Sequence, residues 1–276
     1  MTRTAARPAP FELAYSTACF PAATREEAIL DGTTGVGWCE VALGIDDLAT
    51  AVHWREVLDR GDVECWSVHA PFGQAVDLSA PAVADRGAAL GANLRAAAIA
   101  SELGARLLVV HAGAEPIAEP ERPGHLAAAR DGLRRLERAC ADSGLIMALE
   151  FLPRTCPGNR VEELEYLLAG LPEDAVGVCL DVNHANLGQD LGENVRRLGR
   201  RIATLHISDN DGVDEQHWLP GQGRLDWAAI VASLRSTGYR GPFTYESSRD
   251  RAGGVITPLA IRENYERLIR PLLAKE

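Results

Sequence analysis

The chain has 276 residues, 46% of them hydrophobic, which is enough for the core of one large domain or two small ones. It carries 28 Lys and Arg against 39 Asp and Glu, and this net charge of −11 disfavours broad binding to nucleic acid or anionic membranes. The only lysine is Lys275, in the final dipeptide. Schiff-base enzymes, pyridoxal phosphate enzymes and P-loop hydrolases need a positioned lysine, so the composition excludes them.

The cysteines and the N-terminus indicate the compartment. The six cysteines form no C-x-x-C pair, which disfavours zinc ribbons and thioredoxin-like sites and favours buried free thiols in a reducing environment. The opening segment MTRTAARPAPFELAY lacks the apolar stretch of a signal peptide, and no later segment approaches membrane-spanning length. We therefore predict a cytoplasmic protein with neither membrane nor nucleic acid as a partner.

Short apolar runs rich in Val, Ile and Leu alternate along the chain with longer stretches of helical period. The apolar runs predict strands near 11–17, 36–43, 63–69, 106–111, 145–151, 176–181, 202–207 and 241–246. The stretches between them predict helices near 22–32, 46–60, 82–104, 124–143, 161–170, 190–200, 227–237 and 257–273. Glycines and prolines separate many of these elements.

This alternation indicates an α/β protein formed by a single (β/α)8 TIM barrel, with residues 1–276 as one domain, since such barrels usually have about 250 residues. A doubly wound open sheet is the alternative. It needs a glycine-rich phosphate loop after the first strand, and that segment reads ACFPAATREE. In a barrel the carboxyl ends of all strands meet at one mouth, so polar residues there are candidates for chemistry.

Six of the predicted strands, from residue 63 onward, end in an ionisable residue. These residues are His69, His111, Glu150, Asp181, His206 and Glu246. Burying so many charges without a compensating cation is expensive. Histidine and carboxylate without thiolate form the ligand set of a divalent ion such as Mn²⁺, Mg²⁺, Co²⁺ or Zn²⁺. We therefore predict a metal site at the mouth of the barrel.

Two further signals lie close to the strand ends. Asp181 and His184 stand three residues apart in DVNH, so both can point into the mouth if the chain turns directly after the strand. A long glycine-rich loop follows His206 and carries Asp209, Asp214 and His217. Loops of this kind hold substrate contacts in barrel enzymes.

The motifs VVHAG, LEF, LDVNH and HISDNDG…H…PGQGRLDW resemble the xylose isomerase-like TIM-barrel superfamily, and within it the sugar phosphate isomerases and epimerases. The resemblance covers nearly the whole chain. It implies one divalent metal ion held by Glu150, Asp181, His206 and Glu246. The resemblance favours Mn²⁺ or Mg²⁺ over Co²⁺ or Zn²⁺. Their spacings of 31, 25 and 40 residues fit one βα unit per step.

The resemblance also implies an isomerase of carbohydrate metabolism that moves a proton through a metal-stabilised enediolate. Glu150 and Glu246 are then the catalytic base and acid on the two faces of that intermediate. Proton return to the same carbon gives epimerisation, and return to the neighbouring carbon gives isomerisation. The residues expected to bind the small sugar or sugar phosphate are His69, His111, His184, His217 and Arg224. The resemblance further implies a homodimer or a homotetramer, because small members of this group are often dimers or tetramers.

Two alternatives stay open on the same barrel. One is a metal-dependent lyase or dehydratase. The other is an endonuclease IV-like AP endonuclease with three zinc ions, to which the sequence offers His69, His111, Glu150, Asp181, His184, His206, Asp214, His217 and Glu246. In those nucleases one residue separates the Asp and His of the late loop, whereas two separate Asp214 from His217. The loops after His69 and His111 are also neutral to acidic, which disfavours DNA.

Overall fold

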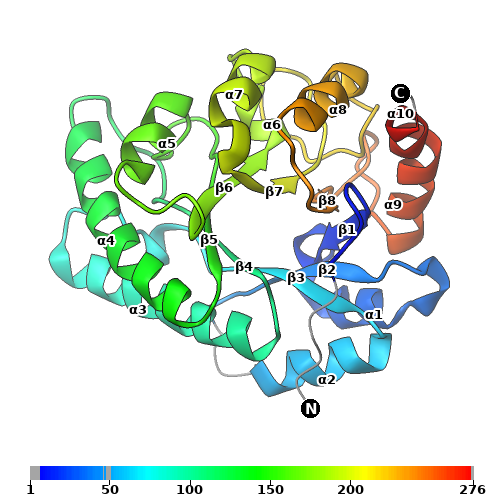
Figure 1. The fold of residues 1–276 in the computed structure, drawn as a ribbon, viewed down its shortest axis with the longest axis horizontal. Coiled ribbons are helices and arrows are strands. Elements are labelled where there is room, and N and C mark those ends of the chain that lie inside the picture. The colour runs from blue at the N-terminus through cyan, green and yellow to red at the C-terminus, as the bar shows by residue number, and fades with distance from the viewer. Residues whose placement is uncertain (1–6, 46, 48–50, 275–276) are drawn as a thin grey trace.

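The computed structural model describes residues 7–45, 47 and 51–274, so Lys275 lies outside the described residues. Eight parallel strands occupy the centre, and the helices surround them (Figure 1). Consecutive strands pair in chain order up to β7, and β1 also pairs with β8. The strands are β1 (Leu13–Ser16), β2 (Trp38–Ala42), β3 (Glu64–His69), β4 (Leu107–Val110), β5 (Ile146–Glu150), β6 (Val176–Asp181), β7 (Ile202–His206) and β8 (Phe243–Tyr245).

The barrel closes between β7 and β8 through Ile207, the residue that follows β7. The Ile207 amide donates to the Thr244 carbonyl at 2.9 Å, and the Glu246 amide donates to the Ile207 carbonyl at 2.9 Å. The predicted (β/α)8 fold is therefore confirmed, and each of the eight predicted strands overlaps an observed one. The open-sheet alternative is wrong because both edge strands find a partner.

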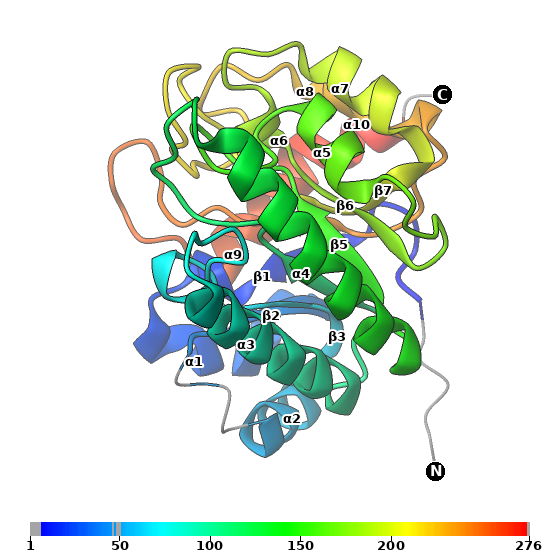
Figure 2. The same ribbon diagram turned by 90° about the vertical axis from the view of Figure 1, so that its left-hand side faces the viewer.

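The helices pack around the outside of the strands, as the side view in Figure 2 shows for α3 and α4. They are α1 (Arg25–Leu30), α2 (Ala51–Gly61), α3 (Val83–Glu102), α4 (Arg122–Asp142), α5 (Val161–Leu168), α6 (Val182–Ala185), α7 (Leu191–Leu198), α8 (Trp227–Ser236), α9 (Pro258–Asn264) and α10 (Arg270–Leu273). Short 3₁₀ turns cover Thr17–Cys19, Ala22–Thr24, Gly32–Thr34, Gln74–Val76 and Gly199–Arg201.

Several predicted helices differ in detail from the observed ones. The predicted helix 46–60 corresponds to α2, and its residues 46 and 48–50 lie outside the described residues. The predicted helix 257–273 consists of α9, a π-helical turn over Tyr265–Ile269 and α10. The sequence did not predict α6, a single turn directly after β6.

Side-chain caps fix where several helices begin. Asp190 accepts from the Glu193 amide at 3.0 Å at the start of α7, and Asp226 accepts from the Ala229 amide at 3.0 Å at the start of α8. These contacts satisfy amide groups that have no partner within the helix. Each cap therefore fixes the residue at which the preceding loop ends and the helix begins.

Alternation along the strands decides which side chains enter the barrel. The interior toward the amino ends of the strands is filled by apolar residues, among them Ala14, Trp38, Trp66, Leu107, Val109, Ala148 and Cys179. Glu150 stands two residues after Ala148, and Asp181 two residues after Cys179, so both carboxylates continue the inward rows. The uppermost inward layer is consequently polar, whereas the layers beneath it are closely packed.

All six cysteines are buried and free, as the sequence predicts. Burial raises the pKa of Cys39 and Cys179 well above the ordinary thiol value, so these groups stay protonated. Across the described ranges, none of the helices combines the length and apolarity needed to cross a membrane.

Candidate active site and metal centre

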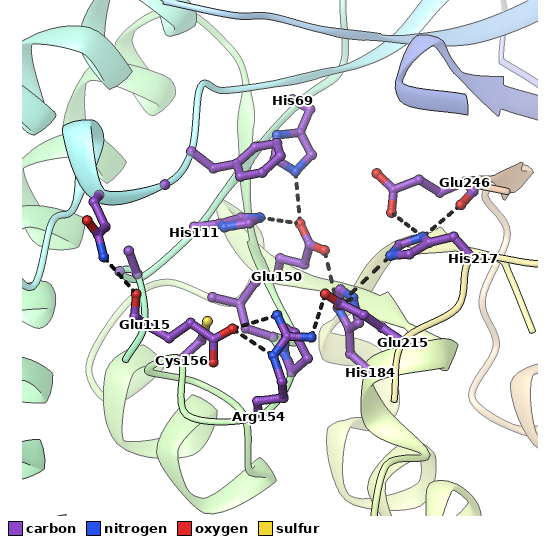
Figure 3. A pocket seen from close by; sticks show the side chains of 17 residues that line it. His69, His111, Glu115, Glu150, Arg154, Cys156, His184, Glu215, His217 and Glu246 are labelled. Atoms are coloured by element: carbon purple, nitrogen blue, oxygen red, sulfur yellow. Dashed lines mark hydrogen bonds and ion pairs between the residues drawn. The ribbon is translucent and has the colours of Figure 1, made fainter. Parts of the chain in front are cut away.

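The carboxyl ends of the strands open into a cavity of about 270 Å³ (Figure 3). Six residues that the sequence singles out line it: His69, His111, Glu150, His184, His217 and Glu246. They belong to β3, β5 and α6, or follow β4, β7 and β8. The barrel thus brings together side chains that stand up to 177 residues apart in the chain.

The four predicted metal ligands form one cluster. Glu150, Asp181, His206 and Glu246 each offer one ligand atom, and these atoms lie within 4.8 Å of one another. Nδ1 of His206 is 3.4 Å from Glu150 Oε1, 3.3 Å from Glu246 Oε2 and 4.0 Å from Asp181 Oδ2. Donor atoms about 2.1 Å from a common ion lie roughly 3 to 4.2 Å apart, so the spacing suits a divalent cation.

Two atoms of this cluster are buried without a hydrogen-bond partner among the described residues. They are Asp181 Oδ2 and His206 Nδ1. The other Asp181 oxygen accepts from the amides of Asn183 at 2.7 Å and His184 at 3.0 Å, which starts α6. Unsatisfied buried polar atoms are costly unless something binds them. An imidazole nitrogen and a carboxylate oxygen facing each other in this way fit a cation such as Mn²⁺, Mg²⁺, Co²⁺ or Zn²⁺.

Glu40 holds the far side of the His206 ring, a contact that sequence reasoning missed. Its Oε1 lies 3.0 Å from His206 Nε2, and Ser67 Oγ donates to its Oε2 at 2.7 Å. Glu40 is fully buried, and burial alone raises its pKa, but His206 and Ser67 lower the pKa to about 2. A charged acceptor at Nε2 keeps the proton on that nitrogen and turns the Nδ1 lone pair toward the cluster.

The two cavity-lining glutamates of the cluster differ in proton affinity. Burial raises the pKa of Glu150, but His111 and His206 outweigh this effect and lower it well below its ordinary value. Burial also raises the pKa of Glu246, and here His206 only partly offsets it, so the pKa of Glu246 stays raised. Glu150 therefore keeps its negative charge more firmly than Glu246.

His69 and His111 converge on the second oxygen of Glu150 (Figure 3). Their Nε2 atoms lie 2.9 Å and 3.0 Å from Glu150 Oε2. Nδ1 of His69 faces the Ala70 carbonyl at 2.7 Å, so both ring nitrogens meet acceptors. Burial lowers the pKa of His69, but its hydrogen bond to Glu150 raises it to about 9. These residues form a second group whose ligand atoms lie within 4.8 Å of one another.

A third group consists of His184, Glu215 and His217, with the same spacing limit of 4.8 Å. Nδ1 of His184 faces the Phe151 carbonyl at 3.0 Å, and Nδ1 of His217 faces the Glu246 carbonyl at 2.9 Å. Nε2 of His184 lies 2.7 Å from Glu215 Oε2 without the alignment of a hydrogen bond. Both imidazoles thus turn Nε2 toward the same carboxylate.

The sequence pointed to Asp214 as the carboxylate of this loop, and the structure corrects it to Glu215. Asp214 is half-exposed and bonds Arg154 Nη1 at 3.0 Å, outside the cavity lining. Glu215 lines the cavity and bonds the same nitrogen at 2.6 Å. One residue separates Glu215 from His217, so the spacing in the sequence could have revealed it.

The glycine-rich loop after β7 is organised by Asp209, which is fully buried. Its carboxylate accepts from the Gly221 amide at 2.8 Å, the Leu225 amide at 3.2 Å and Trp227 Nε1 at 3.0 Å. A Cβ at Gly223 would lie 2.2 Å from Asp209 Oδ1, so only glycine fits there. The HISDNDG…PGQGRLDW motif is therefore explained largely by folding, with His217 and Glu215 as its cavity residues.

Two further residues concern the lining of the cavity, one that the sequence predicted as a substrate contact and one that it did not. Arg224 is exposed and does not line the cavity, although its amide donates to the Asn210 carbonyl at 2.9 Å, and its role as a substrate contact stays a prediction. Phe72, which sequence reasoning missed, lines the cavity and stacks on His111 with ring centroids 4.7 Å apart. Its side chain gives one wall an apolar surface.

The sequence profile of the xylose isomerase-like TIM barrels matches residues 34–271. The chain belongs to this family. It is 35% identical over 117 residues to an uncharacterized protein of Sinorhizobium fredii, an alignment that covers 42% of this chain and 38% of the relative. It is 27% identical over 130 residues to D-psicose 3-epimerase of Enterocloster bolteae, covering 46% of this chain and 41% of that enzyme.

A solved structure has the same fold over nearly its whole length. The crystal structure of a D-tagatose 3-epimerase-like protein superposes with a TM-score of 0.82 at 23% identity, covering 95% of this chain and 97% of the other. The sequence alignments span only about two fifths of the two curated relatives named above. The family and the fold are therefore established by these comparisons.

Proposed function

We propose that this protein is a divalent-metal-dependent isomerase that epimerises or isomerises a small sugar. The observation that supports this most strongly is the cluster of Glu150, Asp181, His206 and Glu246, in which Asp181 Oδ2 and His206 Nδ1 are buried without partners among the described residues. Two of its glutamates also face the cavity. The similarity to D-psicose 3-epimerase and to a D-tagatose 3-epimerase-like protein agrees with this proposal.

A divalent cation held by Glu150, Asp181, His206 and Glu246 would supply positive charge that makes the C–H bond next to a ketose carbonyl more acidic. Glu150 and Glu246 act as base and acid on the two faces of the planar intermediate. His69 and His111 hold Glu150 Oε2, so Oε1 stays directed at the cluster. The firmly ionised Glu150 suits proton removal, and the more easily protonated Glu246 suits proton return.

The charge of the cavity favours an unphosphorylated sugar as substrate. Among the described residues that line it, Arg154 is the sole arginine or lysine, whereas Glu115, Glu150, Glu215 and Glu246 are acidic. Arg154 is already paired with Glu115 at 2.5 Å and with Glu215 at 2.6 Å. A phosphate group would therefore find no free guanidinium, whereas the histidines and carboxylates provide partners for sugar hydroxyls.

The test is hydrogen exchange of ketoses in deuterated water, followed by NMR, with the purified protein loaded with Mn²⁺ or Mg²⁺. We expect exchange at the carbon next to the carbonyl and about one tightly bound ion per chain. Glu150→Gln and Glu246→Gln should each abolish exchange. Glu165→Gln, the same chemical change on an exposed ion pair with Arg197, serves as the control. Full exchange in either cavity variant removes that glutamate from the mechanism.

A second candidate, an AP endonuclease with three metal ions, is favoured by one observation. The groups His69–His111–Glu150 and His184–Glu215–His217 offer ligand atoms beside the main cluster. The acidic lining of the cavity opposes it, because a DNA backbone needs cationic contacts. Three tightly held zinc ions together with cleavage of abasic-site DNA would establish this candidate and overturn the first.

We also propose that the protein is cytoplasmic and assembles as a homodimer or homotetramer. The absence of a membrane-spanning helix among the described residues and the free thiols agree with the first part. Light scattering of the purified protein measures the second part directly.

A further inference from the structure

A second cavity, of about 480 Å³, lies at the opposite end of the barrel, where the amino ends of the strands meet. We call it the amino-end pocket; its lining includes Arg7, Arg106, Arg200 and Arg240 at the rim, with Trp66 and Ile146 as an apolar floor. It shares no lining residue with the cavity at the carboxyl ends. Any ligand bound here is therefore separate from the proposed reaction, and the inference does not rest on that proposal.

The pocket is positively charged in an otherwise acidic chain. Four arginines line it, and no Asp or Glu is found among the described residues of its lining. The chain as a whole carries 39 acidic against 28 basic residues, so acidic partners are abundant elsewhere. Segregation of cations around one cavity creates a local positive potential that attracts anions.

The guanidinium groups of these four arginines are unpaired. Within residues 7–45, 47 and 51–274, none of the four makes a side-chain hydrogen bond or ion pair. The adjacent Arg201 behaves differently, since it donates to the carbonyls of Val176 at 3.1 Å and Leu171 at 3.2 Å and lies 3.5 Å from Glu173. Arg201 has a structural role, whereas the four rim arginines keep their donors available.

Two of the rim arginines, Arg7 and Arg106, repel each other. Burial lowers the pKa of Arg106 below the ordinary guanidinium value, and the positive charge of Arg7 lowers it further. Arg7 belongs to the segment before β1, and Arg106 directly precedes β4, so the fold brings these like charges together from distant parts of the chain. A bound anion would relieve this repulsion.

We propose that the amino-end pocket binds an organic di- or triphosphate. Each guanidinium offers a planar pair of donors that matches the oxygens of a phosphate group. Four guanidinium groups around one cavity offer more hydrogen-bond donors than a single carboxylate or phosphate group can accept. The apolar floor of Trp66 and Ile146 provides a surface for the organic part.

The experiment is isothermal titration of the full chain with ATP, pyrophosphate and AMP, each at two salt concentrations. ATP should bind most tightly, pyrophosphate next and AMP most weakly, and higher salt should weaken all three. Arg106→Gln and Arg200→Gln should each weaken ATP binding roughly tenfold, because each removes a charge-assisted contact. Arg95→Gln, which removes one exposed positive charge from α3, should leave binding unchanged.

Because ATP and pyrophosphate also bind divalent cations, an Asp181→Asn variant separates the two ends of the barrel. Its affinity for ATP should equal that of the unaltered chain. The proposal is overturned if ATP does not bind at millimolar concentration, if AMP binds as tightly as ATP, or if Arg95→Gln weakens binding as much as Arg106→Gln. It is also overturned if Asp181→Asn abolishes binding.

Discussion

Glu40 offers the sharpest test of the proposed metal centre. Its carboxylate is fully buried, lies 3.0 Å from His206 Nε2 and accepts from Ser67 Oγ at 2.7 Å. In Glu40→Gln the amide oxygen can still accept the Nε2 proton, so the ring stays in place and only the negative charge is lost. In Glu40→Leu the acceptor disappears, and a buried N–H loses its partner.

The expected loss of metal affinity follows from this difference between the two variants. Losing a partner behind a metal-binding imidazole weakens metal affinity by about 10- to 100-fold, which corresponds to about 1.4 to 2.8 kcal/mol. We expect the loss of affinity in Glu40→Gln to lie near the lower limit, because the hydrogen bond persists. We expect Glu40→Leu near the upper limit, because Nε2 then has no acceptor and the ring is free to present the wrong nitrogen.

The assay is competition for Mn²⁺ or Co²⁺ between the protein and a chelating dye, with thermal unfolding of each metal-free variant as a check on folding. The control is Glu165→Gln, an exposed carboxylate paired with Arg197 far from the cluster. If folded Glu40→Leu binds the ion as tightly as the unaltered chain, the assigned role of Glu40 is refuted. An equal loss of metal affinity in Glu165→Gln would also refute the assigned role of Glu40.

Three further perturbations test other parts of the structure. Asp209→Ala should lower the free energy of unfolding by about 3 kcal/mol or more in urea titrations, because several buried donors lose their acceptor; a change near zero contradicts its role. Gly223→Ala should lower the melting temperature since its Cβ would meet the Asn210 carbonyl at 2.1 Å, whereas Gly87→Ala on α3, with open space around it, should not. Removal of metal with EDTA should lower the melting temperature, and Asp181→Asn should show a smaller EDTA effect; equal effects would place the ion elsewhere.

Local patterns in the sequence predicted the fold and most of the cavity. Eight apolar runs separated by helical stretches specify a (β/α)8 barrel, and the structure confirms this fold. Residues that close a strand, such as Glu150 and Asp181, could be identified because the fold gathers strand ends at one mouth. Their inward direction also follows from the two-residue period of a strand.

Residues whose direction depends on distant partners escaped prediction. Glu40 stands within β2, and only the closed barrel brings it to His206, 166 residues away. Asp209 looked functional in the loop, but its carboxylate accepts from two loop amides and from the indole of Trp227. Arg224 does not line the cavity, and its role as a substrate contact stays a prediction. Glu215 takes the place expected of Asp214 because the loop turns its side chain inward and leaves that of Asp214 on Arg154.

The sequence by itself therefore determined the barrel, the acidic balance and the strand-end residues that form the cluster. Only the tertiary structure decided which carboxylate supports His206, which loop residue enters the cavity, and where unpaired arginines gather at the amino ends of the strands. The physical reason is the range of the forces involved. Strand and helix patterns arise from neighbouring residues, whereas hydrogen bonds and charge contacts between strands depend on barrel closure and on loop conformation.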